Sequence, residues 1–172
     1  MVKYYLEPYI FILCTNQNGL HIIINLISNH PYNLIEYIYE NIVKNYKLLC
    51  IDKFGCCVIQ KCFEVPINHY VKILINLIEE FALYLSNDDY GSYAILKILQ
   101  TQETDTLKRF MDKLVSNICK GKLTNNYIKV IEKSLEYIGS NLINYIAPHI
   151  LDPKVVTCMA DSPSCLFGKF FT

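Results

Sequence analysis

Apolar and polar residues follow one another along this chain in a pattern that repeats every 36 residues. Gly19, Gly55 and Gly91 lie 36 residues apart, and the same step reaches Tyr127 and then Pro163. Counted from each of these five anchor residues, the third, fourth, seventh and eighth positions are almost always apolar. Because such positions share one face of an α-helix, each copy predicts an amphipathic helix that follows its anchor and buries this face. The expected core residues are, copy by copy, Ile22, Ile23, Leu26, Ile27; Val58, Ile59, Cys62, Phe63; Ala94, Ile95, Ile98, Leu99; Val130, Ile131, Ser134, Leu135; and Leu166, Phe167, Phe170, Phe171.

A second helical stretch is expected before every anchor. The residues 17 and 13 positions upstream of the anchor are apolar in all five copies. Pro31, Pro66 and residues 101–105 fall between consecutive copies, where turn residues and helix N-caps belong. Each copy is therefore predicted to be a helical hairpin. The apolar pairs of the upstream helices are Val2 and Leu6, Ile38 and Ile42, Leu74 and Ile78, Phe110 and Leu114, and Ile146 and Ile150.

Helical hairpins at a fixed period predict an all-α fold, an α-solenoid, because each hairpin buries its faces only against its neighbours. We expect one array over residues 1–172, in units of roughly 1–29, 30–65, 66–101, 102–137 and a truncated 138–172. An ordinary helical bundle is the alternative. It is disfavoured because unrelated helices would not keep a gapless period across five copies.

The other face of the second helix carries the first, second, fifth and sixth positions after the anchor, and we expect this face to be accessible. The sixth position is lysine in four consecutive copies, at Lys61, Lys97, Lys133 and Lys169. A row of ammonium groups would suit a polyanion running across the repeats. Ordinary solvated lysines are the simpler interpretation of the same residues.

The composition describes a folded chain with a large core. Of 172 residues, 52% are hydrophobic and 19% charged, which excludes disorder as a description of the whole. No apolar run approaches the roughly 18 residues of a membrane span, so no membrane partner is expected. Residues 1–14 are apolar but interrupted by Glu7 and Pro8, and we interpret them as part of the fold. With 16 basic and 16 acidic residues, composition alone does not point to a nucleic-acid partner.

The reactive side chains give no pattern that is typical of an enzyme. Eight cysteines without a secretion signal favour free thiols in a reducing compartment, the cytosol or nucleus. The cluster Cys50, Cys56, Cys57 and Cys62 lacks the Cys-x-x-Cys spacing of zinc sites, the four histidines form no metal-binding pair, and no phosphate-binding or nucleophile motif is present. The adjacent carboxylates of Asp88 and Asp89 are expected to interact with a helix N-terminus rather than to act as an acid/base pair. We therefore expect no enzyme activity, no metal and no cofactor.

The segment Asp52-Lys53-Phe54-Gly55-Cys56-Cys57-Val58-Ile59-Gln60-Lys61-Cys62-Phe63-Glu64 resembles the second helix of a Pumilio (PUF) repeat, and the 36-residue period is that family's. Residues 89–93 and 130–133 resemble it more loosely. The resemblance covers essentially the whole chain as five units, against the family's usual eight, as expected of a short or divergent member. It implies that the first and fifth positions of each second helix hydrogen-bond the edge of one RNA base, while the second position stacks between bases.

The resemblance also implies which residues contact RNA. Cys56 with Gln60 is similar to the family's adenine-reading pair, with Cys57 and Tyr93 at stacking positions. In other copies the pairs depart from the pattern, because Leu20 with Ile24 offers no hydrogen bond, and Leu96 and Ile128 are apolar. The candidate RNA-binding residues are His21, Cys56, Cys57, Gln60, Lys61, Ser92, Tyr93, Lys97, Lys129, Glu132 and Lys133.

By resemblance the partner is single-stranded RNA, the 3′ untranslated region of messenger RNA, bound on the concave face. The role would be control of translation or mRNA stability in the cytoplasm, with effector proteins on the convex face as a further partner class. Two alternatives stay open. One is a protein-binding solenoid that uses Leu20, Ile24, Leu96 and Ile128 as an apolar groove. The other is a ribosome-assembly relative that grips structured RNA through its lysines without reading bases.

Overall fold

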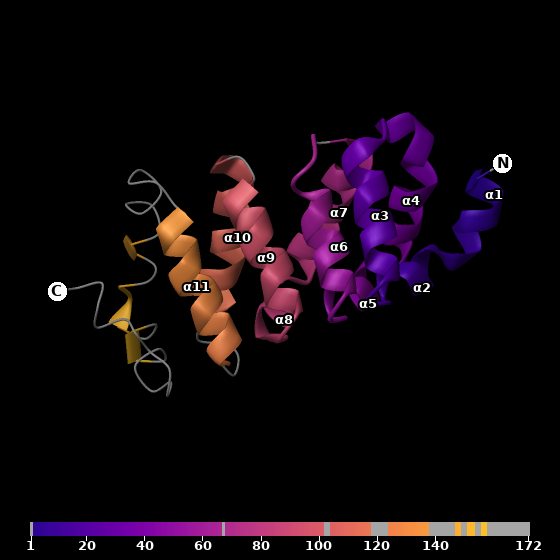
Figure 1. Ribbon diagram of the computed structural model, residues 1–172. Helices are drawn as coiled ribbons and strands as arrows, with labels where there is room; N and C mark the ends of the chain where they lie inside the picture. The colour runs from indigo at the N-terminus through magenta and orange to yellow at the C-terminus, as the bar shows by residue number, and fades with distance from the viewer. Residues whose placement is uncertain are drawn as a thin grey trace. The chain divides into compact units, whose positions relative to one another are not determined.

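A computed structural model describes residues 2–66, 68–101, 104–117 and 124–137, together with the short pieces 147–148, 151–153 and 156–157. All the regular elements in these ranges are helices, and they form the repeating helical units of an α-solenoid (Figure 1). The chain divides into two compact units, Met1–Glu80 and Phe81–Thr172.

Unit 1 holds two stacked layers of helices. Its elements are α1 (Val2–Leu6), the 3₁₀ helix η1 (Glu7–Tyr9), α2 (Ile10–Cys14), α3 (Gly19–Asn29), α4 (Tyr32–Lys44), α5 (Tyr46–Cys50), α6 (Gly55–Cys62) and α7 (His69–Glu80). The second helices α3 and α6 pack against each other, and so do the first helices α4 and α7 (Figure 1). Stacking of like elements from consecutive repeats is the packing that a 36-residue period predicts.

Unit 2 repeats the same arrangement. Its elements are α8 (Ala82–Asn87), α9 (Gly91–Thr101), α10 (Thr104–Asn117) and α11 (Asn125–Tyr137). The second helices α9 and α11 pack side by side, and α10 packs against α8 (Figure 1). The α9 and α11 repeats are also joined by polar contacts, since the Thr124 hydroxyl donates to Asn87 Oδ1 at 2.8 Å.

The predicted hairpin contains an additional short helix. In unit 1 the backbone leaves the helical region at Asn45, with φ −110° and ψ 14°, so that α4 and α5 are separate helices. Short helices also precede the second helices α3 and α9, as α2 and α8 respectively. The expectation of two helices per repeat is thus corrected to a long helix, a short helix and a second helix.

The anchor glycines are needed where the short helix crosses the second helix. A Cβ atom built on Gly19, Gly55 or Gly91 would lie 2.7, 2.7 and 2.8 Å from the carbonyl oxygen of the leucine six residues upstream. Real Cβ atoms do not approach an oxygen so closely, so any larger residue would push the two helices apart. At the fourth anchor Tyr127 is 1% exposed, and its hydroxyl donates to the Leu114 carbonyl.

A side-chain oxygen three residues before each of the first four anchors caps the second helix. Oδ1 of Asn16, Asp52 and Asp88 accepts the backbone N–H of the anchor glycine at 2.9, 2.7 and 2.8 Å, respectively. In the fourth copy the Thr124 hydroxyl oxygen accepts the N–H of Tyr127 at 3.2 Å. Such caps satisfy N–H groups that have no partner within the helix. The expected N-terminal role is thus confirmed for Asp88, whereas Asp89 accepts a hydrogen bond from the Asn126 amide at 2.7 Å.

Most of the expected core is buried. Among the second helices, the buried core residues include Ile23, Ile27, Val58, Ile59, Cys62, Phe63, Ala94, Ile95, Ile98, Leu99, Val130, Ile131 and Ser134. Among the upstream helices they are Ile38, Ile42, Leu74, Ile78, Phe110 and Leu114.

Some expected core positions differ or are not described. Ile22 is 52% exposed, so its expected burial is wrong, and Leu6 and Leu26 are only partly buried. The expected core positions that lie outside the described residues or side chains are Val2, Leu135, Ile146, Ile150, Leu166, Phe167, Phe170 and Phe171.

No single helix within the described residues has both the length and the apolar character to cross a membrane. The segments Lys3–Cys14 and Gly19–Asn29 pass that test of length and composition only as a pair, and they are bent by 117° at the break between them.

Candidate nucleic-acid interface

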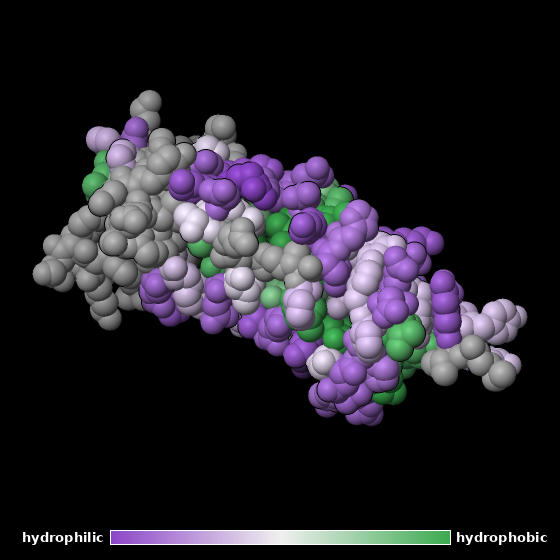
Figure 2. Space-filling view, turned by 90° about the horizontal axis from the view of Figure 1, so that it is seen from above, coloured by the Kyte–Doolittle hydropathy of each residue, from purple (hydrophilic) through white to green (hydrophobic). Residues whose placement is uncertain are grey.

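The second position after the anchor carries an exposed side chain in each of the four described second helices. His21 on α3, Cys57 on α6, Tyr93 on α9 and Lys129 on α11 are all exposed, Tyr93 by 44%. Within each unit the two helices that carry them lie side by side. The described surface is largely hydrophilic in the view of Figure 2, with smaller hydrophobic areas between the polar side chains. An exposed aromatic ring such as Tyr93 is therefore available for stacking against a planar ligand.

The first position is buried, which corrects the expected accessible face. Cys56 is 3% and Ser92 6% exposed, and Leu20 and Ile128 are 7% and 1% exposed. The reason is helical geometry, because seven residues make nearly two full turns and place the first position about 20° from the buried eighth position.

The buried polar groups at the first position are satisfied within their own turn. Cys56 Sγ donates to the Lys53 carbonyl at 3.4 Å, and the Ser92 hydroxyl donates to the Asp89 carbonyl at 3.3 Å. Burial also raises the pKa of the Cys56 thiol to about 12, with a smaller contribution from Cys57. Cys56 is thus a neutral thiol at neutral pH rather than a thiolate.

The fifth position is partly exposed in every described copy, as Ile24, Gln60, Leu96 and Glu132. The Gln60 side-chain amide donates to the Cys56 carbonyl one turn earlier, at 3.2 Å. This bond uses one of the two amide hydrogens and leaves the side-chain oxygen as an acceptor. Gln60 therefore keeps both a donor and an acceptor with which it could pair with a base edge.

Tyr93 and Lys129 form one pair of neighbouring second positions in unit 2. The Lys129 ammonium lies 5.6 Å from the centroid of the Tyr93 ring, a cation–π contact between α9 and α11. Near the start of the same two helices the Asn126 amide donates to the Asp89 carboxylate at 2.7 Å. The ring and the ammonium therefore lie together on one side of adjacent helices, where the Tyr93 ring offers a face on which a planar base could stack.

The three described sixth-position lysines have acceptors three residues later in the chain, which the sequence reasoning missed. Lys61 pairs with Glu64 at 3.3 Å, Lys133 pairs with Glu136 at 2.6 Å, and Lys97 donates to Gln100 at 3.5 Å. The signal was present in the sequence, since each acceptor lies three residues after its lysine.

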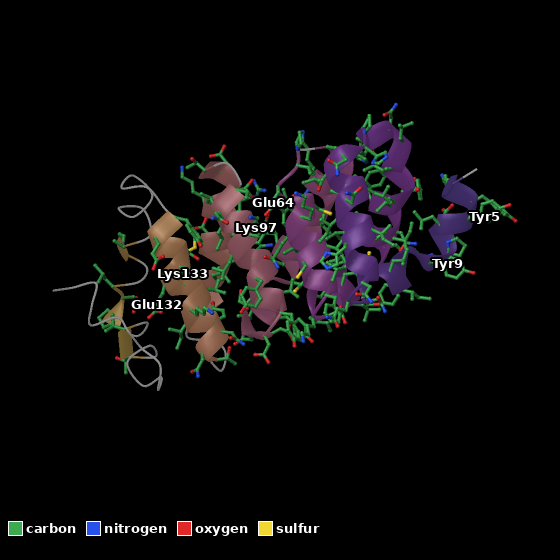
Figure 3. The ribbon with its side chains drawn as sticks, viewed as in Figure 1. Tyr5, Tyr9, Glu64, Lys97, Glu132 and Lys133 are labelled. Carbon is green, nitrogen blue, oxygen red and sulfur yellow. The ribbon has the colours of Figure 1, made fainter. Side chains whose placement is uncertain are left out.

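The ion pairs reduce the free positive charge of the predicted lysine row. The hydrogen bond that the Lys133 ammonium donates to Glu136 raises the pKa of Lys133. The two exposed ion pairs are weak enough for a phosphate to replace the carboxylate. In unit 2 Lys97 and Lys133 lie on the packed helices α9 and α11, as does Glu132 (Figure 3). The fourth lysine of the row, Lys169, is outside the described residues.

The clustered cysteines are free thiols. Cys14, Cys50 and Cys62 are buried in unit 1, and Cys57 is exposed. Burial raises the pKa of Cys14 to about 12 and also raises that of Cys62. In the described part of the chain no three His, Cys, Asp or Glu side chains are arranged to hold a metal ion.

Comparison with known families gives two matched segments. A family model described as the Pumilio-family RNA binding repeat matches residues 45–78 and 82–115. These ranges begin at the short helices α5 and α8 and run through the second helix into the first helix of the next repeat.

Curated relatives cover most of this chain. The chain is 26% identical over 169 residues to putative pumilio homolog 8, chloroplastic, from Arabidopsis thaliana. The aligned region covers 95% of this chain and 30% of the relative. It is 22% identical over 152 residues to a Pumilio domain-containing protein of Schizosaccharomyces pombe, and this alignment covers 87% of this chain and 22% of the relative. The chain therefore spans less than a third of the length of either relative.

Solved structures confirm the solenoid fold. The Puf4 RNA binding domain bound to an HO endonuclease RNA 3′ UTR recognition sequence superposes with a TM-score of 0.84 at 19% identity, over 98% of this chain and 53% of that domain. The RNA-binding domain of yeast Puf5p bound to SMX2 RNA superposes with a TM-score of 0.76 at 17% identity, over 99% and 48% of the two chains. This chain thus spans about half of each solved domain.

Proposed function

We propose that this chain, which belongs to the Pumilio repeat family, binds single-stranded RNA across the second helices of its repeats. The observation that carries the proposal is the pair Tyr93 and Lys129, which stand at equivalent positions of adjacent repeats with the ammonium 5.6 Å from the ring centroid. A flat base that stacks on the Tyr93 ring takes the place of the Lys129 ammonium, which then faces the phosphates, and stacking of this kind contributes about 1–3 kcal/mol per base.

Each remaining candidate residue has a proposed role. In unit 1, His21 and Cys57 occupy the stacking position that Tyr93 occupies in unit 2. Gln60 reads an adenine edge, with the buried Cys56 as a small apolar neighbour instead of a hydrogen-bonding partner. The Glu132 carboxylate accepts a hydrogen bond from an N–H group of the base bound at its repeat.

The remaining polar candidates contribute in other ways. Ser92 supports its helix start through its bond to the Asp89 carbonyl. Lys61, Lys97 and Lys133 contact phosphates after exchanging their present acceptors. Base reading is thus concentrated in a few repeats, since Leu96 and Ile24 have no hydrogen-bonding group.

The biological role that fits this binding is control of messenger RNA translation or stability through sites in 3′ untranslated regions. The cytoplasm is the proposed site of action, because translation and most mRNA turnover occur there. No enzyme activity is part of the proposal. The solved Puf4 domains are bound to RNA 3′ UTR recognition sequences, which supports the same ligand class here.

Substitution of the stacking ring tests the proposal. Tyr93→Ala should weaken binding of a labelled single-stranded RNA about 5- to 150-fold, measured by fluorescence anisotropy, because one base loses its aromatic partner. Tyr84→Ala is the matched control, since Tyr84 is 60% exposed on α8 of the same unit but outside the second helices. Equal affinity of both variants and the unchanged chain would count against the proposed interface.

A further inference from the structure

Three tyrosines form an aromatic cluster on the first helices of unit 1, away from the candidate RNA-binding positions of α3 and α6. Tyr32 and Tyr39 come from α4 and Tyr70 comes from α7. The ring centroids lie 5.8 Å apart for Tyr32 and Tyr39, 6.1 Å for Tyr32 and Tyr70, and 6.5 Å for the nearly parallel pair Tyr39 and Tyr70. Tyr39 is 3% exposed and forms the base, while Tyr32 and Tyr70 are partly exposed above it.

Two glutamates border this cluster. Glu36 and Glu40 lie one turn apart on α4, and both are exposed. Their Oε1 atoms accept hydrogen bonds from the Tyr32 hydroxyl at 3.2 Å and the Tyr70 hydroxyl at 2.9 Å. Within the described ranges neither carboxylate has a lysine, arginine or histidine partner. The two negative charges lie one turn apart and repel each other. Because neither has a basic partner in these ranges, their negative charge is not neutralised.

The tyrosine hydroxyls hold the carboxylates of Glu36 and Glu40 beside the cluster. The hydrogen bond to Glu40 is the main reason why the pKa of Tyr70 is raised to about 12, and burial followed by the Glu36 hydrogen bond raises that of Tyr32. Both phenols are therefore protonated donors at neutral pH. Each carboxylate uses one lone pair for its tyrosine and keeps others for a further donor.

We propose that Tyr32, Tyr39, Tyr70, Glu36 and Glu40 form a docking patch for an arginine side chain from a basic segment of a protein partner. A guanidinium can stack on a partly exposed tyrosine ring and donate its forked N–H groups to the two carboxylates. The charge complementarity points to a cationic peptide, because the same carboxylates would repel the phosphates of RNA or of an anionic lipid surface. This inference goes beyond RNA binding and does not depend on it.

Peptide selection on the whole chain tests the patch. A random dodecapeptide phage library is selected on the unchanged chain and depleted on a Glu36→Gln, Glu40→Gln double variant. Enriched peptides should contain arginine, and a synthetic peptide should lose binding when its arginine is replaced by citrulline, the neutral isostere. In fluorescence anisotropy the double variant should bind such a peptide about tenfold more weakly than the unchanged chain.

Two controls separate docking from general charge and from folding. Glu80→Gln removes an exposed carboxylate at the far end of α7, about 15 Å along the helix from Tyr70, and should leave peptide binding unchanged. Tyr70→Phe keeps the ring but frees Glu40, so it should weaken binding less than the double variant. Circular dichroism melting curves of the variants should match that of the unchanged chain.

Several outcomes would overturn the inference. They are an absence of arginine-dependent enrichment, equal binding of the arginine and citrulline peptides, and equal losses in Glu80→Gln and the double variant. Sedimentation that shows self-association through the patch would identify a second copy of this chain as the occupant instead. Displacement of the peptide by single-stranded RNA would place it on the RNA surface, and would leave the RNA-binding proposal intact while rejecting the separate docking patch.

Discussion

At the scale of single residues, Ser86 on α8 shows how a repeat position can carry a destabilising group. Its side chain is 0% exposed, and among the described residues its hydroxyl has no hydrogen-bond partner. The equivalent positions of the two preceding repeats are Cys14 and Cys50, both fully buried thiols. A thiol is less costly to bury without a partner than a hydroxyl, so the serine is the less suitable residue at this site.

Ser86→Ala should therefore raise the free energy of unfolding by about 1 kcal/mol, because it removes an unsatisfied buried hydroxyl. The change should appear as a higher urea midpoint with an unchanged slope. Ser134→Ala is the matched control in the same unit, since the Ser134 hydroxyl is buried but donates to the Val130 carbonyl. A gain in the control equal to that of Ser86→Ala would show that the missing partner is not the cause.

At the scale of elements, the contact between the short helix and the second helix depends on the anchor glycine. In Gly55→Ala the new Cβ would meet the Leu49 carbonyl oxygen at 2.7 Å, so α5 and α6 must separate. We expect a loss of about 1–3 kcal/mol in urea unfolding, as for other overpacked contacts. Alanine has the higher helix propensity by about 1 kcal/mol, so a stabilised variant would show that the close approach is not limiting.

Asn25→Ala provides the control for Gly55→Ala. Asn25 is exposed on α3 of the same unit, and its replacement changes helix propensity without a steric contact. Its free energy of unfolding should stay within about 0.5 kcal/mol of the unchanged chain.

The sequence predicted these elements better than it predicted their exposure. A gapless period located the second helices at Gly19, Gly55 and Gly91, because burial of one helical face is written in the spacing of apolar residues. The break at Asn45 was missed, since both sides of it are helical and apolar in pattern. The first position was placed on the wrong face because Cys56 and Ser92 are small residues whose type does not reveal burial. The first position lies only about 20° around the helix from the buried eighth position, and this angle would have predicted its burial.

At the scale of the whole molecule, contacts between side chains of two different helices could not be predicted from the pattern of one helix alone. The Tyr93 and Lys129 contact joins residues of consecutive repeats, and a 36-residue step from one to the other marked them as neighbours. The docking patch had no such signal, since Tyr32 and Tyr70 occupy non-equivalent positions and meet only because α4 packs on α7. The net charge of zero likewise conceals local charge, such as the neighbouring carboxylates of Glu36 and Glu40 on α4.

The central claim, reading of single-stranded RNA, is tested most directly by selecting a random RNA pool on the purified chain at two salt concentrations and sequencing the bound fraction. We predict a short adenine-containing motif that Gln60→Ala no longer enriches. Affinity should fall with salt at a logarithmic slope of about 0.7 for each phosphate contacted. Salt-sensitive binding without a motif would instead favour the grip on structured RNA, and the absence of binding at both salt concentrations would contradict RNA recognition altogether.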